Sequence, residues 1–204
     1  MVERLIDVEK AASSNLASRT MMVLNFFLLC VCLVVLLFVL LFFLAQIISI
    51  FTADAPFVPI PREIEDKIIE SLKLNEDSVL YDLGCGDGRV LKSAVEKYPN
   101  IKAVGIEIAF IPYLLARFKT RKNKNIEIRR EDIFKTDIAN ATHIFTYLYP
   151  KVMEKLMPVL EKKCRSGTRI VSCDFEDKNR KPTEIIELSK NNSGRGKRLI
   201  IYSL

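Results

Sequence analysis

The sequence has little of the chemistry that builds metal centres or disulfide-stabilised folds. It contains one histidine and five cysteines, and no two cysteines form a C-x-x-C pair. Zinc sites made of cysteine and histidine use such pairs at fixed spacings, so no metal site is expected. An odd number of cysteines also argues against a disulfide scaffold and indicates a reducing compartment.

Charge is absent from one long stretch of the chain. Residues 20–53 are 34 consecutive positions without Asp, Glu, Lys or Arg, and Met21–Phe51 contains only three polar side chains. A helix that crosses a bilayer needs roughly 20 apolar residues. We therefore expect an N-terminal segment of residues 1–19, followed by an uncleaved transmembrane anchor over residues 20–53.

Two other interpretations of this stretch are open. Ala53-Asp54-Ala55 resembles the cleavage site of a signal peptide, but the apolar run is roughly two to three times a normal signal core and its leader has no net positive charge. The second interpretation is a buried core helix, although a helix that is apolar all round needs a larger protein to cover it.

Charge does not decide the membrane orientation, because three Lys or Arg flank the stretch on each side.

The rest of the chain predicts one α/β domain. Residues 54–61 contain three prolines and predict a short stiff linker, and residues 62–204 predict the domain itself. Strand-like and helix-like segments alternate along it, which is typical of a parallel sheet covered by helices. Expected strands are Ser78–Asp82, Lys102–Glu107, Ile126–Arg130, His143–Leu148 and Thr168–Cys173; expected helices are 61–72, Arg89–Lys97, Ile111–Lys122 and Val152–Lys163.

The C-terminal tail differs from this alternation. Glu184–Leu188 and Arg198–Tyr202 are strand-like, and the turn-rich stretch Asn191–Gly196 lies between them. This pattern predicts an antiparallel hairpin at the sheet edge. The expected fold class is therefore α/β: a Rossmann-like, doubly wound, mostly parallel seven-stranded sheet with a C-terminal antiparallel hairpin, preceded by one N-terminal transmembrane helix.

Three of the seven glycines fall in one turn, Asp82-Leu83-Gly84-Cys85-Gly86-Asp87-Gly88. The turn joins the first expected strand to the next helix, where glycine allows a tight bend and lets a ligand approach the backbone. A dinucleotide-binding turn needs a third glycine at the position of Arg89, and a phosphate loop needs Gly-Lys-Ser/Thr, which is absent. A glycine-rich surface turn without a ligand is the alternative.

Acidic residues follow the next two expected strands. Glu107 ends the second strand, 23 residues after Gly84, at the place where an acid in nucleoside-binding sheets accepts hydrogen bonds from the ribose hydroxyls. Asp132 follows the third strand and is next to Ile133. Taken alone, either acid is also compatible with a solvated charge at a strand end.

Together these residues resemble the class I S-adenosylmethionine (SAM)-dependent methyltransferases, whose first motif is D-x-G-x-G-x-G. Over some 120 residues, Pro56–Phe175, the chain is more narrowly similar to the small membrane-anchored protein-lysine methyltransferases that include the adenine nucleotide translocase and ATP synthase c-subunit enzymes. It departs from that family at Ala109-Phe110, at Phe134 and at Asp174-Phe175-Glu176, where the family has Asn-Pro, Trp and Arg-Phe-Pro.

The resemblance implies that SAM is the cofactor and that the following residues bind it: Asp82, Gly84, Cys85, Gly86, Gly88, Glu107, Ile108, Asp132 and Ile133. Residues after the fourth strand border the transferred methyl group in this fold, which implies Tyr147 and Tyr149 as catalytic residues. Aromatic packing beneath the sheet edge is their alternative role. Asp174 and Glu176 could attract a cationic substrate or be solvated loop charges, and His143 fits a strand start better than a catalytic base.

The expected function is therefore a membrane-anchored methyltransferase that acts on a lysine of a membrane protein. Because the cofactor is made in the cytosol, we expect the catalytic domain on the cytoplasmic side of the membrane or its organellar equivalent. The alternatives are a methyltransferase of a lipid, quinone or other small molecule, and a non-catalytic membrane-tethered binding module. Nucleic acid is disfavoured, because Tyr147-Leu148-Tyr149-Pro150 stands where the Asn/Asp-Pro-Pro-aromatic run of nucleic-acid N-methyltransferases would be.

Overall fold

The computed structural model describes residues 2–52, 60–188 and 195–204 of the 204-residue chain. These residues belong to two units, Met1–Thr52 and Ala53–Leu204. The predicted linker at 54–61 lies outside the described residues except for Ile60 and Pro61. The same holds for most of the predicted turn at Asn191–Gly196.

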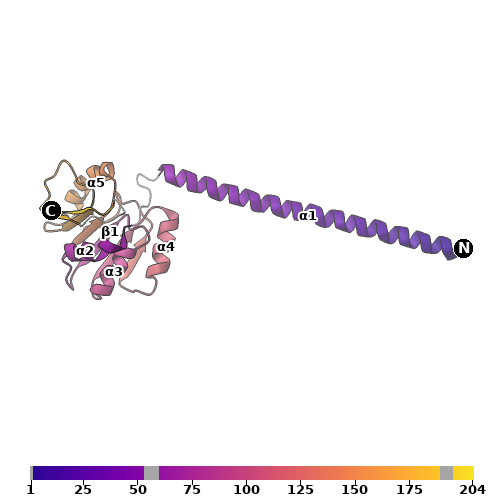
Figure 1. The fold of residues 1–204 in the computed structure, drawn as a ribbon, viewed down its shortest axis with the longest axis horizontal. Coiled ribbons are helices and arrows are strands. Elements are labelled where there is room, and N and C mark those ends of the chain that lie inside the picture. The colour runs from indigo at the N-terminus through magenta and orange to yellow at the C-terminus, as the bar shows by residue number, and fades with distance from the viewer. Residues whose placement is uncertain (1, 53–59, 189–194) are drawn as a thin grey trace. The chain divides into compact units, whose positions relative to one another are not determined.

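The first unit is one helix, α1 (Val2–Thr52) (Figure 1). Its segment Arg19–Ala45 has 27 residues, and the most apolar 18-residue window of that segment has a mean hydropathy of 3.5 and no buried residue. A core helix of a soluble protein would be mostly covered by the rest of the chain. By length and composition the segment could cross a membrane.

The second unit contains a seven-stranded sheet in the order β3-β2-β1-β4-β5-β7-β6. Neighbouring strands from β3 to β5 are parallel, and β7 is antiparallel to both β5 and β6. This confirms the predicted fold class of a mostly parallel sheet with a C-terminal antiparallel hairpin at one edge. The strands are β1 (Val79–Leu83), β2 (Lys102–Ile106), β3 (Ile126–Arg129), β4 (His143–Thr146), β5 (Arg169–Cys173), β6 (Glu184–Glu187) and β7 (Arg198–Ser203).

Helices cover both faces of this sheet, as Figure 1 shows. The helices are a short 3₁₀ turn, η1 (Arg62–Ile64), then α2 (Glu65–Leu72), α3 (Arg89–Lys97), α4 (Phe110–Thr120) and α5 (Pro150–Lys163). Successive side chains of a strand point to opposite faces, so Leu80 packs with α2 and α3 whereas Tyr81 packs with α5. On the second face, Ile133, Phe134 and Ile138 of the β3–β4 connection complete the core beside α5.

Most predicted boundaries agree with the structure to within a residue or two, and the exceptions have local causes. β4 ends at Thr146 and not at Leu148, because the chain leaves the sheet there and enters α5 through Pro150 at the first helical position. The helix expected from Pro61 is divided into η1 and α2. In the described part of the chain no helix follows β3 or β5.

The parallel register fixes where a functional site can form. The carboxyl ends of parallel strands meet at one edge of the sheet, which is where ligands bind in open α/β sheets. The glycine turn follows β1, Glu107 follows β2, Asp132 follows β3 and Tyr147 follows β4. Residues far apart in the sequence are therefore brought to the same edge.

Candidate functional site

The glycine turn bends back onto the end of β2. The N–H groups of Gly84 and Cys85 both donate to the Ile106 carbonyl, at 2.9 and 3.0 Å, and Gly88 N–H donates to the Cys85 carbonyl at 2.9 Å. Gly84, Gly86 and Gly88 have φ angles of 83°, 56° and 75°. L-residues with a side chain are strained in that left-handed region, so the path of this turn requires all three glycines.

Glu107 ties the glycine turn to the loop after β2. Its Oε2 accepts the Gly86 N–H at 3.0 Å and its Oε1 accepts the Ala109 N–H at 2.8 Å. The side chain is buried, and burial raises the pKa of Glu107 although the Ala109 and Gly86 N–H groups act in the opposite direction. Each carboxylate oxygen can accept a further hydrogen bond, so Glu107 could also hold the hydroxyls of a ribose.

Asp82 is a second buried acid beside this turn. Burial raises the pKa of its carboxyl well above the usual range, and the nearby Glu107 and Asp87 carboxylates raise it further. Among the described residues, none donates a hydrogen bond to Asp82. A buried acid without a partner suits a ligand that carries positive charge, as the sulfonium and ammonium groups of SAM do.

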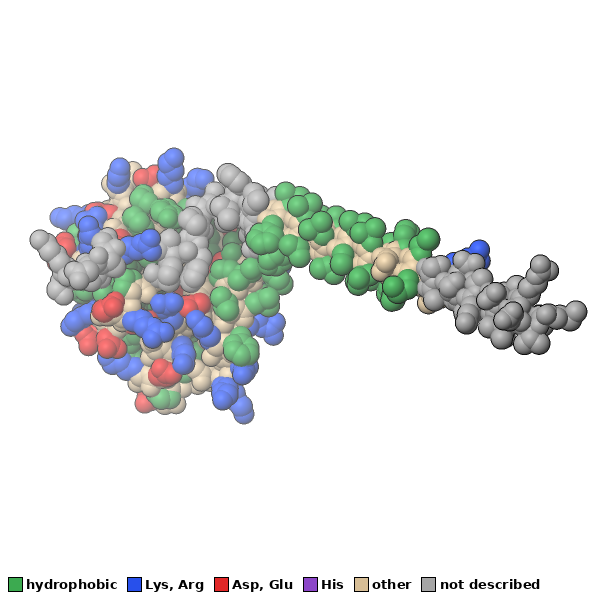
Figure 2. Space-filling model, turned by 45° about the vertical axis from the view of Figure 1, so that its right-hand side comes forward, with side chains coloured by type: hydrophobic (Ala, Val, Ile, Leu, Met, Phe, Trp, Pro, Cys, Tyr) green, Lys and Arg blue, Asp and Glu red, His purple; other side chains and the backbone are tan. Residues whose placement is uncertain are grey.

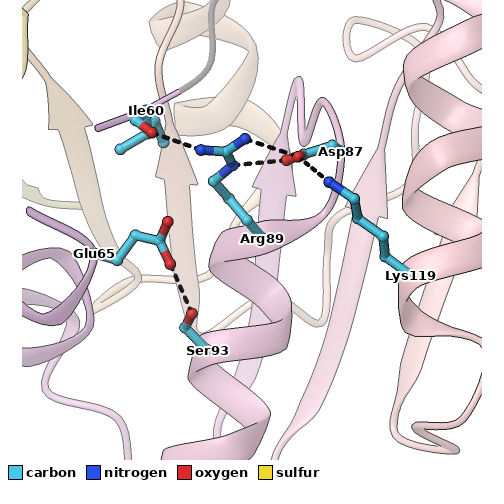
Figure 3. A network of polar contacts seen from close by, with 6 residues as sticks. All are labelled: Ile60, Glu65, Asp87, Arg89, Ser93 and Lys119. Carbon is cyan, nitrogen blue, oxygen red and sulfur yellow. Dashed lines mark hydrogen bonds and ion pairs between the residues drawn. The ribbon is translucent and has the colours of Figure 1, made fainter. Parts of the chain in front are cut away.

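Asp87, the third acid of the turn, is neutralised within the protein (Figure 3). Arg89 binds it in a bidentate manner, with Nε 2.9 Å from Oδ1 and Nη2 2.9 Å from Oδ2, and Lys119 Nζ lies 2.5 Å from Oδ2. Burial alone would raise the pKa of Asp87, but the hydrogen bonds from Arg89 and Lys119 hold it at about 2. Arg89 Nη1 also donates to the Ile60 carbonyl at 2.8 Å, so this network joins the start of the domain to α3 and α4.

Sequence reasoning missed this network. The acid–base pair two residues apart, Asp87 and Arg89, was a visible signal for part of it. Lys119 lies 32 residues further along the chain, and only the packing of α4 brings it to Asp87.

Ile108 and Asp132, two of the predicted cofactor-binding residues, lie in two loops that are connected to each other. Glu107 N–H donates to the Arg129 carbonyl at 3.1 Å, and Arg130 Nε donates to the Ile108 carbonyl at 3.3 Å. Asp132 Oδ1 accepts the Phe134 N–H at 3.0 Å, which fixes the turn after β3. Ile108 exposes 55% of its surface next to Glu107, so the candidate site offers apolar surface beside this acid.

The side chain of Cys85 belongs to the hydrophobic core. It is buried on the α3 face, and its Sγ lies 2.7 Å from where a Cβ on Gly105 would stand. Burial raises the pKa of this thiol, so it stays protonated. Cys85 could therefore contact a ligand through its backbone only.

An aromatic group stands beside the glycine turn at the ends of β4 and β5. The ring centroid of Phe175 lies 5.8 Å from that of Tyr147 and 5.6 Å from that of Tyr149. Between the two tyrosines, Leu148 reaches the glycine turn, since its Cδ2 would be 2.9 Å from a Cβ on Gly84. Burial and the Asp174 charge raise the pKa of Tyr147, so its hydroxyl remains protonated at neutral pH.

The structure gives other roles to the remaining polar candidates. Asp174 Oδ1 accepts the Lys197 N–H and its Oδ2 accepts the Gly196 N–H, both at 2.6 Å, so Asp174 holds the segment that enters β7. Glu176 pairs with Arg198 at 3.9 Å. His143 begins β4, at the end of the strand opposite to the site, as its sequence position indicated.

A parallel sheet of this order, with an acid-lined glycine turn after β1 and an acid after β2, defines a class I SAM-dependent methyltransferase. Residues 82–184 match the ANTKMT methyltransferase domain, and the chain belongs to that family. The match confirms the predicted resemblance and the predicted cofactor, SAM.

Three relatives illustrate the similarity. A protein-lysine N-methyltransferase of Saccharolobus islandicus is 35% identical, across 70% of this chain and 90% of that protein. The human ATP synthase c-subunit lysine N-methyltransferase is 26% identical, across 59% of this chain and 52% of its own length. An RNA methyltransferase of Salinibacter ruber, solved with S-adenosyl-L-homocysteine, is 33% identical with a TM-score of 0.66, across 72% of this chain and 93% of that one.

A side chain on Gly86 is expected to block the cofactor. In Gly86→Ala, calorimetric titration of the full chain in detergent should show S-adenosylhomocysteine binding weakened at least about tenfold, because a methyl group enters the space at the turn. Gly167→Ala is the matched control, since Gly167 has a φ of 85° and no atom lies within 4 Å of its added Cβ. Equal affinity in wild type and Gly86→Ala would contradict a ligand at this turn.

Asp87→Asn is expected to destabilise the domain by about 2 kcal/mol, the value of a pKa lowered from 3.8 to about 2. For a domain of this size that corresponds to a fall in Tm of roughly 4–8 °C, measured by near-ultraviolet circular dichroism. Because the folded-state pKa is lowered, the wild-type stabilisation is complete above pH of about 4 and is lost as the pH falls towards 2. The exposed pair of Glu127 and Arg129 is the control: Glu127→Gln should change Tm by no more than about 2 °C.

Proposed function

We propose that this chain is a membrane-anchored protein-lysine N-methyltransferase whose substrate is a membrane protein. The observation that carries the proposal is the 35% identity to a protein-lysine N-methyltransferase across 90% of that protein. The similarity to two ATP synthase c-subunit lysine methyltransferases, from human and Caenorhabditis elegans, supports the same acceptor group. The aromatic group of Tyr147, Tyr149 and Phe175 beside the glycine turn also supports an amine as the acceptor.

SAM supplies an electrophilic methyl group on a positively charged sulfur. In this proposal Asp82 and Glu107 give the pocket the negative charge that favours this cation, and Glu107 accepts hydrogen bonds from the ribose. Ile108 and Ile133 provide apolar surface for the adenine, and Asp132 accepts a hydrogen bond from its amino group. Gly84, Gly86 and Gly88, with the backbone of Cys85, leave the space that the cofactor occupies.

The lysine acceptor is assigned to the aromatic group of Tyr147, Tyr149 and Phe175. A lysine amine has a pKa of about 10.4 in water and must lose its proton before its lone pair can attack a methyl group. Aromatic faces attract the ammonium form as it arrives, and the loss of water around it lowers its pKa. These side chains would therefore orient and desolvate the amine. Its proton would pass to solvent water, after which the nitrogen lone pair would form the N–C bond as the C–S bond breaks and the sulfur becomes a neutral thioether.

Membrane attachment is assigned to the apolar segment of α1. Arg19–Ala45 is long and apolar enough to span a bilayer. Only 14 residues separate it from Ile60, so the catalytic domain stays close to the membrane. We place that domain on the cytoplasmic side, or its organellar equivalent, because SAM is made in the cytosol.

RNA is the second candidate substrate, because the RNA methyltransferase of Salinibacter ruber shares 33% identity across 93% of its length. Against it stands the Tyr147-Leu148-Tyr149-Pro150 run described above. One experiment separates the classes: the full chain is incubated with tritiated SAM and with membranes, soluble protein, RNA or extracted lipid from a cell that lacks it. Methyl-lysine recovered from a hydrolysed membrane protein is expected. Label that is lost on ribonuclease treatment, or that partitions into the lipid extract, would refute the proposal.

Tyr149→Ala is expected to lower kcat/KM for methyl transfer at least about tenfold and to leave S-adenosylhomocysteine affinity within about twofold. The reason is that the proposed binding site of the acceptor amine loses one of its aromatic rings, whereas the glycine turn is unchanged. Tyr149→Phe is the matched control, because it keeps the ring and removes only the hydroxyl, and it should retain most activity. A Phe variant as impaired as the Ala variant would instead assign the role to the hydroxyl.

Two arginines in the middle of α1 are expected to release the chain from membranes. Each arginine at a bilayer centre costs about 2.5–3.5 kcal/mol, so Leu33→Arg together with Leu37→Arg opposes insertion. The wild-type chain should remain in the pellet after alkaline carbonate washing, and the double variant should appear in the supernatant. Leu33→Ile with Leu37→Ile is the control, and a wild-type chain extracted by carbonate would contradict anchoring.

A further inference from the structure

Helix α4 has an apolar face that the domain does not cover. Of its eleven residues only Ala116 and Thr120 are buried. The uncovered side chains recur at the spacing of one helix face, and Phe110 and Phe118 expose 49% and 66% of their surface. We call this the α4 face, and it consists of Phe110, Ile111, Leu114, Leu115 and Phe118.

Figure 2 shows hydrophobic side chains gathered on the side of the domain where Figure 1 places α4, with basic side chains beside them. The cofactor accounts for the neighbouring Ile108 in the proposed site, but it does not account for residues further along the helix. An exposed row of five large apolar side chains on one helix indicates an interaction surface.

Along α4 and the turn after it the charge has one sign. From Ile108 to Ile126 the chain contains five basic residues and no acid, and the nearest acids in the sequence are Glu107 and Glu127. The Arg121 guanidinium lies 3.7 Å from the centre of the Phe118 ring, and that of Arg130 lies 5.1 Å from the centre of the Phe110 ring. Lys119 is engaged by Asp87, which leaves Arg117, Arg121, Lys122, Lys124 and Arg130 to form a basic rim.

We propose that the α4 face docks on an anionic phospholipid surface. Large apolar side chains with basic residues beside them are the composition of helices that lie in the membrane interface, where cations near anionic lipids strengthen binding. A second copy of this chain would bring the same basic rim against itself, and like charges oppose that contact. The bilayer is also within reach, because the 14 residues between Ala45 and Ile60 span at most about 50 Å.

This inference rests on the proposed membrane anchor and extends it. α4 begins three residues after Glu107, so the docked face lies beside the carboxyl edge of the sheet where the site forms. Docking at α4 therefore holds the pocket at the level of the headgroups. A lysine near the end of a transmembrane segment would be within reach of that pocket.

The absence of tryptophan from the chain makes a direct test possible. A single tryptophan, introduced as Phe118→Trp in the full chain, reports the surroundings of the α4 face without background. The chain is reconstituted in vesicles of phosphatidylcholine alone or with about 30 mol% phosphatidylserine, each with and without brominated acyl chains. Bromine quenching at least about threefold stronger in the anionic vesicles is expected.

Two variants control for position and charge. Lys155→Trp, on an exposed site of α5, should show no bromine quenching in either lipid. Arg121→Gln with Lys122→Gln, added to Phe118→Trp, should remove most of the difference between the lipids. Unchanged S-adenosylhomocysteine affinity in each variant shows that the domain is folded.

The same vesicle samples test the α1 anchor and the docking of the α4 face separately. Flotation of the wild-type chain with pure phosphatidylcholine vesicles tests α1 alone, and a chain that fails to float there contradicts the anchor. In a chain that floats, equal quenching in both lipids or no quenching in either overturns docking on anionic lipid. A blue-shifted emission without bromine quenching places the face against protein, and it also overturns the proposal.

Discussion

The contact on which the site depends is the carboxylate of Glu107, held between the N–H groups of Gly86 and Ala109. It joins the loops after β1 and β2, so the glycine turn and the ribose-binding position form one rigid unit. Its burial is unfavourable, and Asp82 is buried beside it without a donor from the described residues. Two such acids favour a cationic ligand in a protein whose net charge is +6. SAM has that charge at its sulfur, and the product S-adenosylhomocysteine has lost it.

Asp87 shows how one turn can use similar acids for opposite purposes. It has a bidentate arginine and a lysine as partners, and its pKa is lowered to about 2, whereas the pKa values of Asp82 and Glu107 are raised. The neutralised acid stabilises the fold, since it links α3, α4 and the carbonyl of Ile60. Among the described residues, Asp82 has no donor, and Glu107 accepts from the Gly86 and Ala109 N–H groups. The acids of this site therefore differ in their partners, and the ligand-binding role proposed above falls to Asp82 and Glu107.

The sequence predicted most of what local pattern determines. The alternation of strand-like and helix-like segments located the five parallel strands, and the turn-rich tail predicted the C-terminal hairpin. The glycine spacing identified the methyltransferase family, which the family match confirms. What it missed depends on tertiary packing. From the sequence, Asp174 could either attract a cationic substrate or be a solvated loop charge. In the structure it accepts hydrogen bonds from backbone N–H groups 22 and 23 residues away. Lys119 reached Asp87 only through the placement of α4, and Cys85 turned into the core because Gly105 leaves room for its sulfur.

The close approach of α4 to the glycine turn also explains why its large apolar residues point away from the domain. A Cβ on Gly88 would lie 3.2 Å from the Ala116 side chain and 3.3 Å from that of Thr120. Only small side chains fit between helix and turn, so α4 contributes little apolar surface to the core. Its phenylalanines and leucines must lie on the outer side, where water is a poor environment for them. The tight glycine turn thus leaves an apolar helix face beside the candidate site, and the proposed membrane anchor would bring a lipid surface close enough to cover it.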